Sequence, residues 1–303
     1  MAVFAVVEKY TRFNPLNLIL PVRERPLAAM NDVLSTFPHR ILLGTALAMG
    51  WPLVFGLTNY FKESHLKKIL LWGSIILLLA GCYFSNSRGP WLAIIISGAL
   101  ILFFSSSKTK MKIFLICGFV MIGLLLSPGV WETISGRATA TLEQGTFKGN
   151  TYQYRWELWR IAYDKIKESN MKIFIGYGPG THEVMEIFGT LSYSGMDHEF
   201  GSWDNHYAAE LLETGLIGLA LLLILDFSIL RQFFKTLKKS ALPDKDVLTG
   251  IIASIIVMIF MKTNVQIFAP QLNYLFWTLV ALGAAMTRCI NFEFEDSESE
   301  VEE

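Results

Sequence analysis

The sequence predicts an all-α polytopic membrane protein with about seven transmembrane helices and one large extracytoplasmic loop that contains an amphipathic helix. Two observations predict this fold class. Only 17% of the 303 residues are charged, whereas soluble domains usually have ~25%, and 52% are hydrophobic. The charged residues are also unevenly spaced, so that several uncharged apolar stretches are about as long as the hydrocarbon core of a bilayer is thick.

Seven segments are long and apolar enough to be spans. Each must be a helix, because no water is present in hydrocarbon to satisfy the backbone hydrogen-bonding groups of an irregular chain. Residues 40–127 therefore hold transmembrane helices 1–4, and residues 208–289 hold helices 5–7. The seven spans are expected at roughly 40–60, 68–84, 90–106, 111–127, 208–230, 247–267 and 270–289.

Lysine and arginine collect in every second loop. The loops 61–68 and 105–112 carry three basic residues each and the loop 231–246 carries five, whereas the turn at 85–89 holds only Arg88. The positive-inside bias therefore places the three basic loops in the cytoplasm. Residues 1–39 and 128–207 must then face outward.

The two ends of the chain differ in character. Residues 1–39 form an outer segment whose apolar start, MAVFAVV, resembles the last turns of a helix, so we expect a remnant of an upstream span there. Residues 290–303 form a cytoplasmic tail in which seven acids follow Asn291 without a single base. So little apolar surface predicts that this acidic tail is disordered.

The outer loop 128–207 is too long to be a mere connector. Its residues 152–166 place aromatic and apolar side chains at spacings of four, three, four and three residues, which is the period of one helix face. The sequence thus predicts an amphipathic helix that lies on the membrane surface or packs its stripe on the transmembrane bundle. The stripe consists of Tyr152, Trp156, Trp159, Tyr163 and Ile166.

Arginines on the outer side are candidate anion ligands. Arg88 stands in the turn Ser87-Arg88-Gly89-Pro90-Trp91, and its guanidinium can hold two phosphate oxygens at once. The alternative is an arginine that snorkels beside an interfacial tryptophan. Arg23, Arg25 and Arg40 precede the first span, where they either widen an anion site or mark the interface.

A glycine-rich segment, Gly176-Tyr177-Gly178-Pro179-Gly180, follows the predicted surface helix. Pro179 interrupts any dinucleotide-binding fingerprint, and no strand-turn-helix unit surrounds the segment. Gly176, Gly178 and Gly180 instead predict a turn that brings backbone close to a ligand or to the bundle, with a plain turn as the alternative.

Polar residues gather where the fifth span begins. His206, Glu210 and Glu213 are four and three residues apart, so they share one helix face at the outer mouth of this span. Ionisable groups so close to hydrocarbon indicate function. For Asp204 and Asn205, the alternative is to cap the helix N-terminus.

The remaining composition predicts neither metal nor cofactor. Cys82, Cys117 and Cys289 lie in or beside apolar runs without CxxC spacing, which argues against zinc and disulfide frameworks. The net charge of zero is not that of a nucleic-acid-binding protein.

Taken in order, SRGPW, YRWELWRIAYDKI, GYGPG and DNHYAAELLETGLIGLALLL resemble the O-antigen ligase and polymerase superfamily over most of residues 20–230. The resemblance implies a GT-C-like glycosyltransferase of the bacterial inner membrane whose active face is periplasmic. Its donor would be a saccharide linked to undecaprenyl pyrophosphate, and its acceptor would be a glycan or a lipid. The protein would also contact membrane lipid. It would need no metal ion.

The resemblance also implies residue roles. Arg88 and Arg155 match family arginines. The ligase motif of histidine, then Asn/Ser/Gln, nine residues and GxxG fits Asn205, Gly215 and Gly218, but Asp204 stands at the histidine position. This departure favours a polymerase-like or divergent member. The implied catalytic set is Asp204, His206, Arg88 and Arg155, and the substrate-binding set is Arg23, Arg25, Arg40, Gly176, Gly178, Gly180, Asn205 and Glu210.

The implied function is inverting transfer or polymerisation of saccharides in cell-surface polysaccharide synthesis. Two alternatives stay open. Some relatives in this superfamily are labelled as bicarbonate transporters. A transporter should show broken helices or ionisable groups near the middle of the bilayer. A non-catalytic subunit of a polysaccharide assembly is the other.

Overall fold

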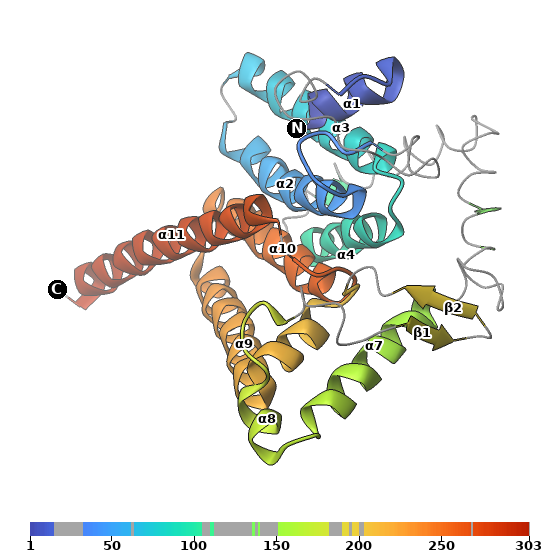
Figure 1. Cartoon of the computed structure of the whole chain (residues 1–303). Coiled ribbons are helices and arrows are strands. Elements are labelled where there is room, and N and C mark those ends of the chain that lie inside the picture. Colours follow the sequence, from blue (N-terminus) through green and yellow to red (C-terminus); the bar gives the residue numbers. More distant parts are fainter. Residues whose placement is uncertain are drawn as a thin grey trace. The chain divides into compact units, whose positions relative to one another are not determined.

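The computed structural model describes two compact units (Figure 1). The first unit comprises Met1–Lys110, Asp226–Met261 and Ile267–Glu303, and the second comprises Met111–Leu225 and Lys262–Gln266. The described residues are 1–14, 33–61, 64–104, 110–111, 135–136, 139, 151–181, 190–193, 196–199, 203–267 and 269–302, with backbone alone at 151–155, 190–193, 196–199 and 294–302.

Long apolar helices build the first unit. Four helices of the described chain, α2, α3, α9 and α11, are long and apolar enough to cross a membrane, and α4 is a shorter apolar helix. These four candidate spans coincide with the spans predicted at 40–60, 68–84, 208–230 and 270–289. The bounds are α1 Ala2–Thr11, α2 Arg40–Tyr60, α3 His65–Phe84, α4 Arg88–Phe104, α9 His206–Lys239, α10 Asp244–Lys262 and α11 Pro270–Glu302.

The other three predicted spans have different outcomes. The span expected at 90–106 corresponds to α4, which has 17 residues. The span expected at 247–267 corresponds to α10, which has acidic residues in its first turn and ends at Lys262. The span expected at 111–127 lies outside the described residues.

Glycines bring α2 and α10 into backbone contact. A Cβ on Gly56 would lie 2.6 Å from the carbonyl oxygen of Asp246, and a Cβ on Gly250 would overlap that of Pro52. Small residues allow such close packing between helices in a membrane. The amide Nδ2 of Asn59 also donates to Oδ2 of the buried Asp246 over 2.6 Å, so the end of α2 is joined to the start of α10.

The first unit therefore has two distinct ends. At one end, which we call the Arg88 end, a Cβ on Gly44 would lie 2.6 Å from Cγ of Pro90, so the start of α2 packs on the first turn of α4. At the other, the basic end, α2 finishes beside Asp246, where the basic segment 231–246 also finishes. Arg88 and this basic segment thus lie at opposite ends, as the alternation of charged loops predicts.

The apolar start of the chain is helical, as expected from its resemblance to the last turns of a helix. Ala5 of α1 packs near Gly81 of α3, and Tyr10 contacts the ring of Phe84 edge-on. The buried carboxylate of Glu8 accepts hydrogen bonds from the backbone N–H groups of Leu34 and Ser35 over 3.1 and 2.6 Å. These bonds fasten α1 to the chain just before α2.

The second unit holds α7 Thr151–Ile166, α8 Asn170–Ile175, the first part of α9 and a small antiparallel hairpin. The hairpin pairs β1 Thr190–Tyr193 with β2 Met196–Glu199, Thr190 opposite Glu199. It is an exception to the all-α prediction. The threonine and tyrosine of β1 favour strands.

The amphipathic helix predicted at 152–166 is observed as α7, and part of the predicted stripe is buried within the second unit. Its buried residues are Leu158, Ala162 and Ile166, which pack against Trp203 and the first turns of α9. Trp156 and Tyr163 are instead 63% and 49% exposed. Trp159 of the stripe is half-buried against the same cluster.

The acidic tail is helical rather than disordered. Helix α11 begins at Pro270 and continues without a break to Glu302. Glutamate has a high helix propensity, and a helix already nucleated by the apolar segment adds residues without a further nucleation cost.

Candidate active site

Arg88 is held by a rigid turn at the Arg88 end of the first unit. The hydroxyl of Ser85 and the indole N–H of Trp91 both donate to the carbonyl of Cys82, over 2.6 and 3.2 Å. The rings of Tyr83 and Trp91 stack with centroids 5.5 Å apart. Arg88 is the half-buried first residue of α4, so its charge adds to the positive end of that helix dipole.

Arg40 lies at the same end of this unit. It is the first residue of α2, whose N-terminus is capped by His39, since Nδ1 of His39 accepts from the N–H of Ile41 over 3.3 Å. Gly44, one turn later, packs on Pro90. The structure thus brings two arginines and two helix N-termini to one end, which favours anion binding. Arg23 and Arg25 lie outside the described residues.

Asp204, Asn205 and His206 form the entrance to α9 in the second unit. The preceding Trp203 is 1% exposed, and its carbonyl accepts from the N–H of Gln266 over 3.0 Å. The buried Asn205 caps α9, because its Oδ1 accepts from the N–H of Ala208 over 3.2 Å. The N-cap alternative for Asn205 is therefore confirmed, while Asp204 and His206 are half-buried on either side of it.

Helix α9 is broken at Gly215, which has φ 66° and ψ −163°. Gly176 has nearly the same backbone conformation, φ 69° and ψ −161°. Only glycine readily adopts this region. A Cβ on Gly215 would lie 2.5 Å from the carbonyl of Phe174, and a Cβ on Gly176 would overlap that of Glu213. The glycine-rich segment and the α9 break therefore meet backbone to backbone.

The break frees backbone carbonyls, and the glycine-rich segment satisfies two of them. The N–H groups of Tyr177 and Gly178 donate to the carbonyls of Leu212 and Glu213, each over 2.9 Å. The N–H of Gly180 donates to Oε1 of Glu213 over 3.0 Å. The turn predicted at 176–180 is confirmed, and its three glycines all contact or bond α9 residues.

We expect Gly215→Ala to lower the free energy of unfolding of the second unit by about 2–4 kcal/mol. An alanine at position 215 would be strained by the positive φ, and its Cβ would displace the carbonyl of Phe174. Thermal unfolding in detergent measures the loss. Gly73→Ala is the matched control, because a Cβ there would meet nothing within 4 Å, and its midpoint should stay or rise. Equal midpoints for both variants would contradict the tight contact.

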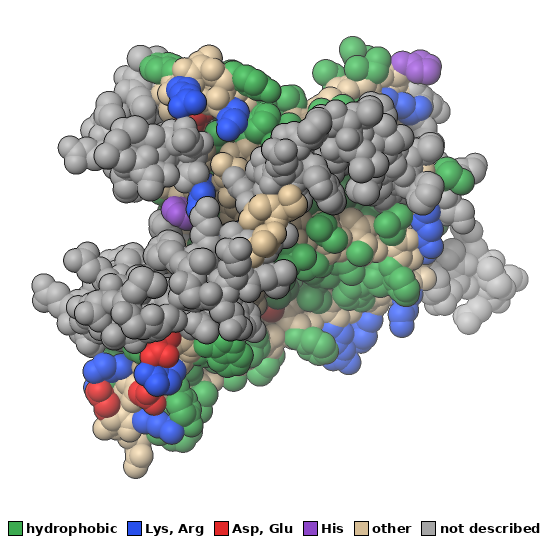
Figure 2. Space-filling model, turned by 90° about the vertical axis from the view of Figure 1, so that its right-hand side faces the viewer, with side chains coloured by type: hydrophobic (Ala, Val, Ile, Leu, Met, Phe, Trp, Pro, Cys, Tyr) green, Lys and Arg blue, Asp and Glu red, His purple; other side chains and the backbone are tan. Residues whose placement is uncertain are grey.

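Charged side chains fix the turn between α7 and α8 to the glycine-rich segment. The Tyr177 hydroxyl donates to Oε2 of Glu168 over 2.6 Å, and Nζ of Lys165 donates to Oε1 over 2.8 Å. Both bonds hold the pKa of Glu168 below its ordinary value, the lysine first. Figure 2 shows acidic and basic side chains together at the lower end of the molecule, at the height of α7 and α8 in Figure 1.

Glu210 and Glu213, which were predicted to share one helix face with His206, have different hydrogen-bond partners. Oε1 of Glu210 accepts from the hydroxyl of Thr214 over 2.9 Å, whereas Glu213 binds the glycine-rich segment. Sequence reasoning did not assign Glu213 this role, because no local pattern links it to Gly180, which lies 33 residues earlier. Within the described ranges, no three His, Cys, Asp or Glu residues are grouped to hold a metal ion.

The candidate residues are thus divided. Arg40 and Arg88 belong to the first unit, whereas the glycine-rich segment and the α9 entrance belong to the second. Arg155 lies in α7, and its side chain is not described.

Comparison with known proteins gives one family. Residues 73–223 match the family model described as O-antigen ligase. The matched segment begins in α3, ends in α9 and includes Arg88, Arg155, Asp204 and His206. No curated protein matches the chain.

Proposed function

Since the chain belongs through residues 73–223 to the O-antigen ligase and polymerase superfamily, we propose that it is an inverting glycosyltransferase. It moves or polymerises saccharides from a polyprenyl-pyrophosphate carrier during cell-surface polysaccharide synthesis. The proposal rests on one observation: the family match contains a rigid arginine turn and, in the second unit, a kinked helix with ionisable residues at its entrance.

The arginines stabilise the leaving group in this mechanism. As the bond between the anomeric carbon and the pyrophosphate oxygen breaks, negative charge grows on the diphosphate. Arg88 and Arg155 neutralise that charge, and Arg23, Arg25 and Arg40 contribute to binding the same anion. Fixed donors aimed at developing charge usually supply the largest catalytic term.

The other partner in the reaction is an acceptor hydroxyl of a glycan or lipid. It attacks the anomeric carbon from the face opposite the pyrophosphate, so one displacement inverts the configuration. Asp204 or His206 takes up the hydroxyl proton, and the pyrophosphate leaves on its lipid. Asn205 and Glu210 line the same entrance and hold the saccharide, and Gly176, Gly178 and Gly180 support that entrance from the neighbouring turn.

The same residues argue for a periplasmic active face in the bacterial inner membrane. Within the first unit, Arg88 lies at the end opposite the basic segment 231–246. The positive-inside bias assigns that basic segment to the cytoplasm. A lipid-linked saccharide in the outer leaflet would then present its diphosphate at the depth of Arg88.

The transporter alternative is less well supported by the helix break. Broken helices at transport sites turn their free carbonyls toward the ion. In α9, the carbonyls of Leu212 and Glu213 accept from the glycine-rich segment instead. The buried Asp226 lies five residues before Arg231, about 7.5 Å along the helix, and hence near its basic end rather than at mid-bilayer.

Membranes containing the full chain should convert a defined lipid-linked oligosaccharide. We expect chromatography to show either lengthened lipid-linked glycan, which identifies a polymerase, or glycan moved to a second acceptor, which identifies a ligase. Membranes without the chain serve as the control. An unchanged donor, with the chain shown to be inserted and a range of acceptors supplied, would contradict the proposed activity.

A further inference from the structure

A pocket of about 490 Å³ lies between α9 and α11 in the first unit. It is at the basic end, because residues 286–293 of α11 line a second cavity together with Tyr60 and Asp244. The pocket is therefore remote from Arg88 along α2. Its lining residues are Gln232, Phe233, Ala284, Thr287, Arg288, Asn291 and Phe292.

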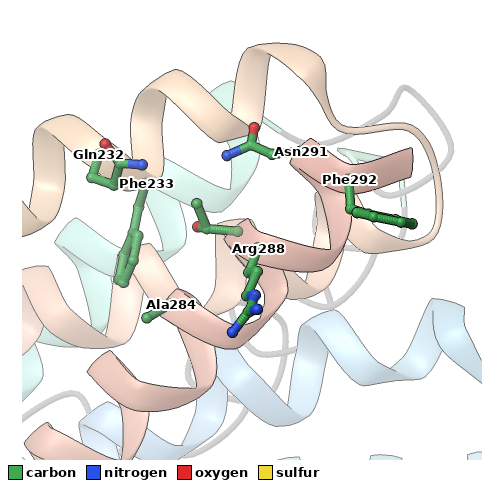
Figure 3. A pocket seen from close by; sticks show the side chains of 7 residues that line it. Gln232, Phe233, Ala284, Arg288, Asn291 and Phe292 are labelled. Atoms are coloured by element: carbon green, nitrogen blue, oxygen red, sulfur yellow. The ribbon is translucent and has the colours of Figure 1, made fainter. Parts of the chain in front are cut away.

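The lining combines hydrogen-bond donors with apolar side chains. Figure 3 shows the amides of Gln232 and Asn291 turned toward one another, with Phe233, Ala284 and Arg288 below them in the view. Thr287 is 7% exposed, and its Oγ1 has no hydrogen-bond partner within the part of the chain that the structure describes. A buried hydroxyl without a partner costs free energy, so it indicates an unfilled polar contact.

The position along the helices matches the depth of lipid headgroups. Residues 270–287 of α11 carry no charge, and this length of helix rises about 27 Å, close to the thickness of the hydrocarbon core. Arg288 is the first charged residue after it. In α9, Arg231 is the first basic residue after the apolar segment, directly beside Gln232. Both arginines thus mark the boundary between hydrocarbon and headgroups.

Positive charge on α9 favours an anion, and the acids of α11 begin only at Glu293. Arg231 and Lys235 are both exposed on the last turns of α9. Basic residues close to the cytoplasmic leaflet attract anionic lipids. An arginine binds phosphate oxygens in two places, while the amides and a hydroxyl suit the glycerol portion of a headgroup. Ala284, one turn before Arg288, offers exposed apolar surface on the hydrocarbon side of the pocket.

We propose that this pocket binds the phosphate-bearing headgroup of an anionic phospholipid in the leaflet at the basic end. Arg288 binds the phosphate, and Thr287 donates its hydroxyl to an oxygen of the same lipid. The site lies at the other end of the first unit from Arg88, and it does not depend on the proposed glycosyl transfer.

Native mass spectrometry of the purified full chain in detergent tests the site with two lipids of the same acyl chains, phosphatidylglycerol and phosphatidylcholine. We expect preferential retention of phosphatidylglycerol. Arg288→Ala should weaken this retention about tenfold, as loss of a charged hydrogen bond does, and Thr287→Val by about threefold. Glycerol phosphate added in excess should compete only weakly, because it lacks the acyl chains.

Lys238→Ala is the matched control. It removes an exposed positive charge from the same end of α9 but does not line the pocket, so retention should stay within twofold of the unchanged chain. Equal losses in Lys238→Ala and Arg288→Ala would replace the site with diffuse attraction and overturn the proposal. So would unchanged retention in both Arg288→Ala and Thr287→Val. Full competition by glycerol phosphate would assign the pocket to a soluble phosphate instead of a lipid.

Discussion

Replacing Arg88 by alanine is expected to lower the rate of glycan transfer by about a hundredfold to a thousandfold, the usual cost of removing one donor that stabilises a developing oxyanion. Arg88 is the candidate best fixed in place, because hydrogen bonds from Ser85 and Trp91 and the stack on Tyr83 hold its turn. The measurement is turnover of a defined lipid-linked oligosaccharide by purified protein.

Two controls separate catalysis from folding. Arg88→Lys keeps the charge but loses the two-pronged geometry, so it should retain part of the rate, less than a tenth. Arg231→Ala removes an arginine from the basic end and should leave transfer unchanged. All three variants must insert and unfold at the same temperature as the unaltered chain. A full rate in Arg88→Ala would remove this arginine from the mechanism.

The helices of this chain could be predicted from sequence because long uncharged runs have few alternatives in a membrane. The segment 40–60 matches α2 to the residue, since charged or polar residues bound the run at both ends. The buried face of α7 was only partly predictable, for a different reason. Aromatic spacing indicates a helix, but which side is buried depends on how closely α9 can approach.

The candidate site, too, could be predicted only in part from the sequence. A tight turn carrying Arg88 follows from SRGPW alone. The contact between Gly176 and Gly215 could not be predicted, because it joins residues 39 positions apart through backbone atoms that leave no side-chain signature. Each glycine alone predicts a turn or close packing, and only the fold shows that each is the other's neighbour.

Asp204→Asn is expected to lower glycan transfer by roughly a hundredfold to ten-thousandfold, the contribution of a general base. Residue 204 stands at the motif's histidine position, one residue before the capping Asn205. Asparagine keeps the shape and polarity of aspartate but takes up no proton at neutral pH. The measurement is kcat with acceptor at saturation, so that weaker acceptor binding does not enter.

His206→Gln is the matched comparison, because it keeps a hydrogen-bonding side chain at the first residue of α9. We expect less than a tenfold loss. A large loss here with near-normal Asp204→Asn would assign the base to the imidazole. Full activity in both variants would place the base outside this entrance and leave the arginines as the only catalytic groups proposed for this chain.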